Sequence, residues 1–226
     1  RRDFTVNAIA WNPCSGEVRD PTGGGADLDR RLLRPCTRTS LVDDPLRLLR
    51  AIRMLCSFPL RPAPGLLDQL RAHARLLSRV SAERIRDEFF ACLGAGLPPW
   101  WDVMVESELL FEVLPEMRAA AGTRQDHFHH LDVLSHSAEA LRRVEAHAAA
   151  GFVDLTDHGP RLEGHLARPM VVHRSAWNLL KLAVLLHDVG KPCTQRLEPS
   201  GRIRFPGHAL RGAVLAQGIG TRLVLS

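Results

Sequence analysis

The spacing of apolar residues divides the chain into a short alternating start and a long helical remainder. Residues 4–11 form an apolar stretch, a turn follows at 13–16, and residues 17–20 are typical of the returning strand of a hairpin. The sequence then predicts a flexible glycine connector, a short helix and a short strand, at residues 23–25, 27–30 and 32–35. The first forty residues therefore indicate an α/β segment.

From Asp43 onward the apolar residues recur with a helical period. Asp44 stands where an N-cap is expected, and Pro45 suits a first helical turn. One arc of the helix, roughly 120° wide, is apolar, and it is made by Leu48, Leu49, Ile52 and Leu55. The rest of the chain is also typical of helices, with Ser81 as an expected N-cap.

A change in composition near residue 120, where histidines become frequent, predicts a domain boundary. Residues 150–175 lack periodicity and predict a loop or insertion between helices at 132–149 and 176–189. We expect a mainly α fold with a small α/β remnant at the N-terminus, in three parts. These are an α/β part at 1–40, a helical part at 41–120, and a second helical part, rich in histidine, at 121–226.

Composition narrows the class of protein. With 45% hydrophobic and 24% charged residues, the chain is typical of a globular protein. Its net charge is +5, and all 30 basic residues except Lys181 and Lys191 are arginine, which weakly favours a polyanionic partner such as RNA or a nucleotide. The five cysteines are widely spaced and there is no apolar run of about 20 residues, so we expect a cytoplasmic protein with no membrane span.

Two arginine-rich segments are candidates for phosphate or nucleotide binding. Arg1, Arg2 and Asp3 open the chain, where cations beside a carboxylate could hold a phosphate and a ribose hydroxyl. The alternative is a solvated chain start, which the residue types alone favour. The second segment is the predicted helix after Asp43, which places three arginines opposite its apolar arc: Arg47, Arg50 and Arg53.

A carboxylate and a guanidinium on such a helix offer an acceptor and a donor to the Watson–Crick edge of a base. The alternative is an amphipathic helix whose arginines face solvent. Only Arg47 has acidic residues three or four positions away, Asp44 and Asp43, so Arg50 and Arg53 have no oppositely charged neighbours on their own helix. A solvated arginine face is the commoner arrangement in general, but the missing local partners count against it here.

A second candidate site lies in the last hundred residues. The stretch 126–136 contains four histidines and two aspartates, and His187-Asp188 follows about fifty residues later, after the apolar run 179–186. Imidazole and carboxylate ligands suit a divalent metal, which activates water for attack on a phosphoester. Lys191 is near enough in sequence to hold a phosphate. Most histidines are structural or solvent-facing, which is the alternative here.

Four segments in order resemble class II bacterial tRNA nucleotidyltransferases, the family of CCA-adding enzymes. They are Arg1 to Ala8, Asp20-Pro21 with Gly24 and Asp27-Leu28, Asp43 to Arg53, and Ala82 to Glu88. The resemblance implies that Arg2 contacts the nucleotide and that Asp44 and Arg47 pair with incoming CTP or ATP. Arg50 and Arg53 match further nucleotide-binding arginines, and Asp20, Gly24 and Asp27 match a hinge. Asp43 stands where the family usually has Glu.

The resemblance also implies that residues 1–40 are a partial head domain and residues 41–120 a helical neck and body, and it implies what to expect of the activity. The family adds CCA or A to tRNA 3′ ends without a template, using Mg²⁺ held by two aspartates that lie upstream of the matched region. We therefore expect the chain by itself to bind nucleotide poorly and to add none, whereas a longer parent protein would do so. The motifs do not distinguish CCA addition from A-only addition, and they leave the oligomeric state open.

The second half resembles the HD phosphohydrolase superfamily, through the context Leu-Leu-His-Asp-Val-Gly-Lys-Pro. This resemblance implies His136, His187 and Asp188 as metal ligands, with His208 as an additional ligand in two-metal versions. The superfamily's final aspartate has no match, because no aspartate follows His208. A metal-dependent phosphohydrolase or phosphodiesterase is therefore the second hypothesis. A helical RNA-binding fragment without chemistry of its own is the third.

Overall fold

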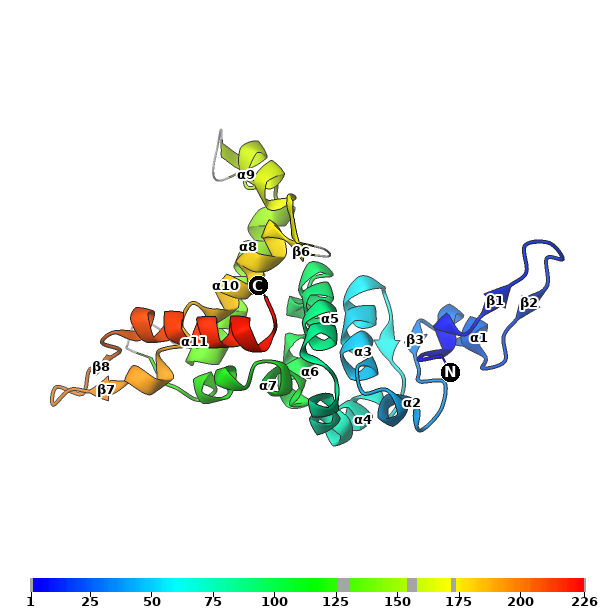
Figure 1. Ribbon diagram of the computed structural model, residues 1–226, viewed down its shortest axis with the longest axis horizontal. Coiled ribbons are helices and arrows are strands. Elements are labelled where there is room, and N and C mark those ends of the chain that lie inside the picture. The colour runs from blue at the N-terminus through cyan, green and yellow to red at the C-terminus, as the bar shows by residue number, and fades with distance from the viewer. Residues whose placement is uncertain (1, 126–130, 154–157, 172–173, 226) are drawn as a thin grey trace. The chain divides into compact units, whose positions relative to one another are not determined.

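The computed structural model describes residues 2–125, 131–153, 158–171 and 174–225, and it is mainly helical with short strands (Figure 1). The chain divides into two compact units, Arg1–Val113 and Leu114–Ser226. Among the described residues, no helix is long and apolar enough to cross a membrane.

Unit 1 begins with short elements and continues as a stack of helices. Its strands are β1 (Ala10–Trp11), β2 (Val18–Arg19), β3 (Leu32–Leu33) and β4 (Arg61–Pro62). Its α-helices are α1 (Gly24–Asp29), α2 (Ser40–Asp43), α3 (Arg47–Ser57), α4 (Leu66–His73), α5 (Ala82–Gly94), α6 (Trp101–Glu106) and α7 (Leu109–Val113). Its 3₁₀ helices are η1 (Thr5–Asn7), η2 (Ala74–Arg79) and η3 (Pro98–Trp100).

The predicted hairpin is confirmed, although its strands are shorter than expected. β1 and β2 pair antiparallel with Ala10 opposite Arg19. Residues 5–7, predicted as part of the strand, instead form η1, because the Asn7 and Ala8 amides bond back to the Phe4 and Thr5 carbonyls. Phe4 itself is fully buried and bridges to Pro35.

The glycine run was wrongly predicted as a flexible connector. Gly24 and Gly25 form the first turn of α1, and the carboxylate of Asp20 accepts their two amide N–H groups at 2.7 and 2.8 Å. A Cβ on Gly24 would lie 2.1 Å from the Thr5 carbonyl oxygen. The glycine is therefore needed because α1 crosses η1 closely, and not because the chain bends there.

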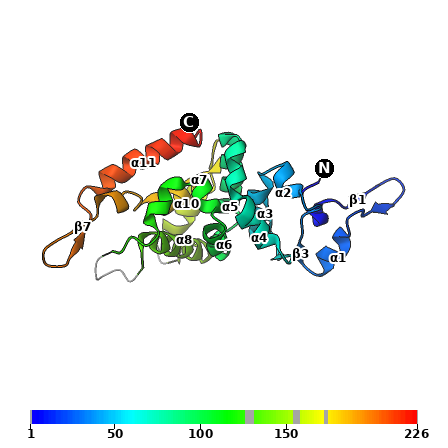
Figure 2. The same ribbon diagram turned by 90° about the horizontal axis from the view of Figure 1, so that it is seen from below.

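The core of unit 1 forms where α3 packs beside α5, as Figures 1 and 2 show. Leu48, Leu49 and Ile52 of α3 are fully buried, as the apolar arc predicted, and Phe89 and Phe90 of α5 are buried too. The helix starts later than predicted, because Leu46 and not Asp44 is its N-cap residue. Ser81 is the N-cap residue of α5, as predicted.

Unit 2 consists of α-helices joined by short helices and hairpins. Its α-helices are α8 (Val133–Ala149), α9 (Gly159–Leu166), α10 (Ala176–Leu186) and α11 (His208–Arg222), and its 3₁₀ helices include η4 (Pro115–Ala120) and η6 (Pro192–Thr194). Its strands are β5 (Pro169–Val171), β6 (Arg174–Ser175), β7 (Arg196–Leu197) and β8 (Ile203–Arg204), paired as two antiparallel hairpins.

Helices α8 and α10 lie side by side (Figure 1). Side chains cap both helices, since Asp132 accepts from the Ser135 amide and Ser175 accepts from the Asn178 amide. α10 ends at Leu186, three residues earlier than predicted. The predicted loop at 150–175 is also wrong in part, because α9 and the strands β5 and β6 lie within it.

Two glycines bring α11 against the turn that follows α10. A Cβ on Gly190 would lie 2.2 Å from the His208 carbonyl oxygen and 2.5 Å from the Gly212 nitrogen. Only a glycine at 190 allows the start of α11 to approach this closely. His208, the first residue of α11, is thereby held with its Nε2 4.0 Å from Oδ1 of Asp188.

Candidate functional site

The first candidate site lies between the segment before α3 and the start of α5. Asp44 is partly exposed, and both of its carboxylate oxygens lie 3.2 Å from Nη2 of Arg84. On its other side, Nε of Arg47 lies 4.0 Å from Oδ2 of Asp44. Arg47 is 9% exposed, and its Nη1 donates to the Ser40 carbonyl oxygen at 3.0 Å. One carboxylate is therefore flanked by two guanidiniums.

The other two arginines of α3 do not form the solvated face that the amphipathic alternative requires. Nη2 of Arg50 lies 2.8 Å from Oδ2 of Asp3, a residue only 5% exposed. Arg53 pairs through Nε with Glu88 of α5. Their partners come from distant parts of the chain, which explains why the sequence of the helix alone showed none.

Arg2 and the residues that match the hinge lie in the first segment of unit 1. Arg2 is exposed, next to the buried Asp3, and Arg1 lies outside the described residues. Asp27 is buried, where it accepts hydrogen bonds from Thr5 Oγ1 at 2.8 Å and from Arg34 Nε at 2.9 Å. The residues that match the hinge thus fasten α1 to its neighbours.

Asp20 contributes to this fastening as a charged group. Its hydrogen bonds from the Gly25 and Gly24 amides hold the pKa of the carboxyl below its usual value. The carboxylate lies at the N-terminus of α1, where its negative charge interacts favourably with the partial positive charge of the amide N–H groups in the first helical turn.

The second candidate site gathers three predicted metal ligands. Nε2 of His187 lies 3.2 Å from Nε2 of His136 and 3.0 Å from Oδ2 of Asp188, while His136 Nε2 lies 3.5 Å from the same oxygen. Donors bound to one metal ion at about 2.1 Å are themselves separated by about 3.0 to 3.4 Å. The three side chains therefore fit a shared divalent ion.

Hydrogen bonds to backbone carbonyls orient two of the rings. Nδ1 of His187 lies 2.8 Å from the Val184 oxygen, and Nδ1 of His208 lies 2.8 Å from the Phe205 oxygen. Because each carbonyl accepts the Nδ1 proton, the Nε2 lone pair of each neutral ring is left for a metal. His208 is the more distant of the two, with Nε2 4.0 Å from Oδ1 of Asp188.

Charges around Asp188 keep it ionised although it is 4% exposed. Burial raises the pKa of this carboxyl, but hydrogen bonds from His187 and Lys191 outweigh burial and lower the pKa well below its usual value. The same hydrogen bond from His187 to Asp188 raises the pKa of the imidazole against the opposing effect of burial. Nζ of Lys191 lies 2.7 Å from Asp188 Oδ2 and donates to Gln125 Oε1 at 2.6 Å.

The sequence interpretation missed Arg84 and Gln125. Arg84 belongs to the segment Ala82 to Glu88, which carries the family resemblance, but the sequence alone assigned it no role at the site. Gln125 lies 66 residues from Lys191 and no pattern links them. His127, His129 and His130, part of the predicted ligand-rich stretch, lie outside the described residues.

Comparison with known proteins finds family matches for two segments of the chain. Residues 1–34 match the family described as Poly A polymerase head domain. Residues 60–120 match the family described as Probable RNA and SrmB- binding site of polymerase A. An A-adding tRNA nucleotidyltransferase of Deinococcus radiodurans is 39% identical over 232 residues, covering 100% of this chain and 48% of that protein.

Two further similarities also extend over nearly all of the chain. A CC-adding tRNA nucleotidyltransferase of Thermus thermophilus is 32% identical over 224 residues, covering 96% of this chain and 45% of that protein. The structure of a CCA-adding enzyme complexed with ATP superposes with a TM-score of 0.61, over 100% of this chain and 42% of that chain. Its sequence identity is 21%, so it supports the fold alone.

The chain thus spans about half the length of the curated relatives that it matches. The matched head and RNA-binding segments agree with the similarities that extend over nearly all of the chain. The chain is therefore similar, over nearly all of its length, to A-adding and CC-adding tRNA nucleotidyltransferases.

Proposed function

We propose that this chain carries the nucleotide-selecting part of an enzyme that adds C or A residues to the 3′ end of tRNA. The supporting observation is the carboxylate of Asp44, accessible to solvent and flanked by the guanidiniums of Arg84 and Arg47. Arg47 is fixed by burial and by its bond to Ser40, whereas Arg84 is about half exposed. Arg84 can therefore exchange its bond to Asp44 for a bond to a nucleotide.

The chemistry of the bases explains why one such site would accept both CTP and ATP. Cytosine and adenine each carry an exocyclic amino donor beside a ring-nitrogen acceptor, which suits a carboxylate acceptor and a guanidinium donor. Uracil and guanine present a carbonyl beside a ring N–H, which is the reverse order. The site would discriminate without a nucleic acid template.

In the intact protein, Mg²⁺ would supply charge neutralisation at the triphosphate, and aspartates outside this chain would hold it. Arg2, Arg50 and Arg53 are proposed to serve the phosphates or to keep α3 in place, with the hinge residues Asp20, Gly24 and Asp27 supporting the head. The helical residues 60–120 would hold the tRNA acceptor end by shape and phosphate contacts.

The test is the nucleotide selectivity of the full-length protein. Calorimetric titration of that protein should show binding of CTP and ATP in preference to UTP and GTP, and it should incorporate labelled CTP or ATP into tRNA without its 3′ end. Asp44→Asn should remove the selectivity, whereas Asp102→Asn, an exposed carboxylate on α6, should keep it. Equal binding of all four nucleotides by the unaltered full-length protein would contradict the proposal.

A second function is favoured by the grouping of His136, His187 and Asp188. We propose that unit 2 is an HD-type domain in which these three side chains hold a divalent metal, with His208 as a further ligand. The metal would supply an activated water for phosphoester hydrolysis. Lys191, beside Asp188, would bind a phosphate oxygen, and the carbonyl bonds of His187 and His208 would keep their Nε2 atoms in position.

Metal content and hydrolysis test this second function separately from the first. The chain should bind one Mn²⁺ or more per molecule and hydrolyse bis(p-nitrophenyl) phosphate. His136→Gln should lose both properties, whereas His165→Gln, an exposed histidine on α9, should keep both. Salt-dependent binding of tRNA without nucleotide selectivity or hydrolysis would instead support the RNA-binding fragment.

A further inference from the structure

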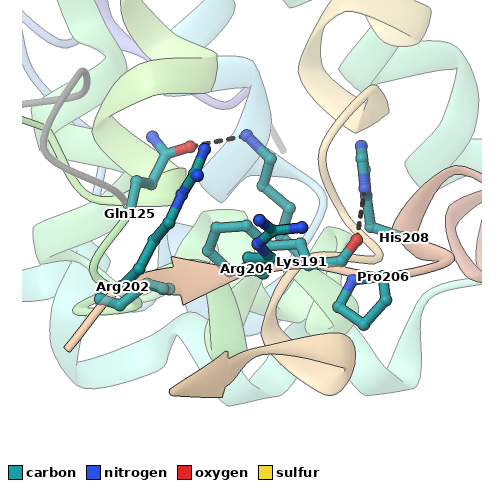
Figure 3. Close-up of a pocket in the computed structure, with 8 residues that line it drawn as sticks. Gln125, Lys191, Arg202, Arg204, Pro206 and His208 are labelled. Carbon is teal, nitrogen blue, oxygen red and sulfur yellow. Dashed lines mark hydrogen bonds between the residues drawn. The ribbon is translucent and has the colours of Figure 1, made fainter. Parts of the chain in front are cut away.

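The β7–β8 hairpin carries arginines that neither proposed function uses. Arg202 precedes β8 and Arg204 belongs to it, and both line a cavity of about 460 Å³ with Gln125, Lys191, Phe205 and His208 (Figure 3). This volume lies within the range of about 300–1,000 Å³ that is usual for small-molecule sites. The cavity is therefore large enough for part of a substrate.

The lining is strongly cationic. It contains Lys191, Arg202 and Arg204 together with His208, and no carboxylate is among the described residues that line it. Arg204 has a partner elsewhere, because its Nε lies 2.8 Å from Glu198 Oε1. Within the described residues, Arg202 is exposed and no carboxylate pairs with it. A ligand for this cavity is expected to be an anion.

The cavity is continuous with the metal ligands through two residues. Lys191 lines it and also contacts Asp188, and His208 lines it while its Nε2 faces Oδ1 of Asp188. Figure 3 labels Arg202 among the side chains that line the cavity, together with Lys191 and Gln125, which a hydrogen bond joins. If the reacting phosphate of a substrate lies at the metal, the part of the substrate next to that phosphate would extend into the cavity that Arg202 lines.

We propose that the cavity is a subsite for a second phosphate, so that the preferred substrate of unit 2 carries two phosphate groups, as in a nucleoside bisphosphate or an RNA end. The proposal rests on the metal-dependent hydrolase function above. Arginine presents a planar fork that binds two oxygens of one phosphate, which suits Arg202 for this role. Ile203 and the ring of Phe205 supply an apolar surface beside it for ribose or base.

The hairpin is built to keep Arg202 in place. The Glu198 amide donates to the Arg202 carbonyl at 2.9 Å, and Leu197 pairs with Ile203 in the ladder. The ion pair between Arg204 of β8 and Glu198, which follows β7, also links the two sides of the hairpin. Because these contacts use backbone atoms or other side chains, the Arg202 side chain can be replaced without removing the hairpin.

Calorimetric titration with adenosine 3′,5′-bisphosphate and with AMP tests the subsite, in the metal-free chain and with Mn²⁺. We expect the bisphosphate to bind at least about tenfold more tightly. Arg202→Gln should abolish that preference and leave AMP binding unchanged, and Arg202→Lys should retain part of it. Arg196→Gln is the matched control, since it removes the same charge from β7, where Arg196 lies outside the cavity lining.

The outcomes separate the two proposals. Equal binding of bisphosphate and AMP, or a preference that survives Arg202→Gln, would overturn the subsite whatever the metal content is. Failure of the chain to bind Mn²⁺ would overturn the hydrolase proposal, while an Arg202-dependent preference in the metal-free chain would still support the subsite. A short RNA with a 3′-phosphate, tested as a third ligand, should bind more tightly than the free bisphosphate if the substrate is polynucleotide.

Discussion

Arg50 and Asp3 join a helix to the first residues of the chain through a contact of 2.8 Å. Asp3 also accepts hydrogen bonds from the Phe4 amide and from Asn7 Nδ2, so its carboxylate organises the segment next to Arg2. The arginine face of α3 therefore fixes the position of the head segment in addition to any contact that it makes with nucleotide.

Replacing Asp3 by Asn should destabilise unit 1 by about 1–3 kcal/mol, because Arg50 would keep its charge and lose its nearly buried partner. Urea denaturation followed by circular dichroism measures the change. Glu17→Gln breaks the well-exposed pair with Arg19 and should cost less than about 0.5 kcal/mol. Similar costs for the two variants would contradict the structural role of Asp3.

Lys181 is only 2% exposed, and its Nζ lies 2.6 Å from Glu145 Oε1 and 4.9 Å from the centre of the Trp177 ring. Lys181→Met should destabilise unit 2 by about 3 kcal/mol, since the carboxylate of Glu145 would lose its partner at the contact between α8 and α10. The double variant Lys181→Met/Glu145→Leu should recover more than half of the loss. Purely additive costs in the double-mutant cycle would refute this coupling.

Gly190→Ala should destabilise unit 2 by several kcal/mol and weaken metal binding, because the added Cβ would collide with backbone atoms of His208 and Gly212. Thermal denaturation and Mn²⁺ titration report the two effects. The control is Gly218→Ala on α11. A Cβ at residue 218 meets nothing within 4 Å, so this change should be neutral or stabilising by up to about 1 kcal/mol. A tolerated alanine at 190 would show that α11 can move away from the turn.

Metal affinity should fall as the pH is lowered, and the fall should begin at a pH above the usual pKa of histidine. The bond to Asp188 raises the pKa of His187, so in the metal-free site the protonated imidazole persists to a higher pH than usual and competes with the metal. The affinity decreases with falling pH because metal binding requires the neutral ring. Mn²⁺ titrations between pH 8 and 5.5 check this, and an affinity that is constant down to pH 6 would argue against His187 as a ligand.

Local patterns in the sequence predicted the main helices because burial follows them closely. Leu48, Leu49 and Ile52 recur at helical spacing and are fully buried, so periodicity alone located α3. Short elements escaped this reasoning. In α9, which begins at Gly159-Pro160, only Leu166 and Gly159 are buried, so it has no apolar stripe to detect.

The candidate sites were predictable only where a motif marked them. The histidine–aspartate pair at 187–188 is a local signal, and the structure brings His136 to it from 51 residues away. Arg84 meets Asp44 across 40 residues, and Gln125 meets Lys191 across 66, without any periodic pattern. Such pairs depend on how helices pack, which a single sequence does not encode locally.

β3 pairs in parallel with β4, with Leu32 opposite Arg61. The chain between the two strands, which contains α2 and α3, therefore forms a loop closed by this pairing. A recombinant protein that began at residue 41 would lose that ladder, the buried side chain of Leu33 and the Asp3 partner of Arg50 at once. A protease cut between residues 34 and 39, by contrast, would leave both pieces attached to each other. The head segment is thus an integral part of the helical body that follows it.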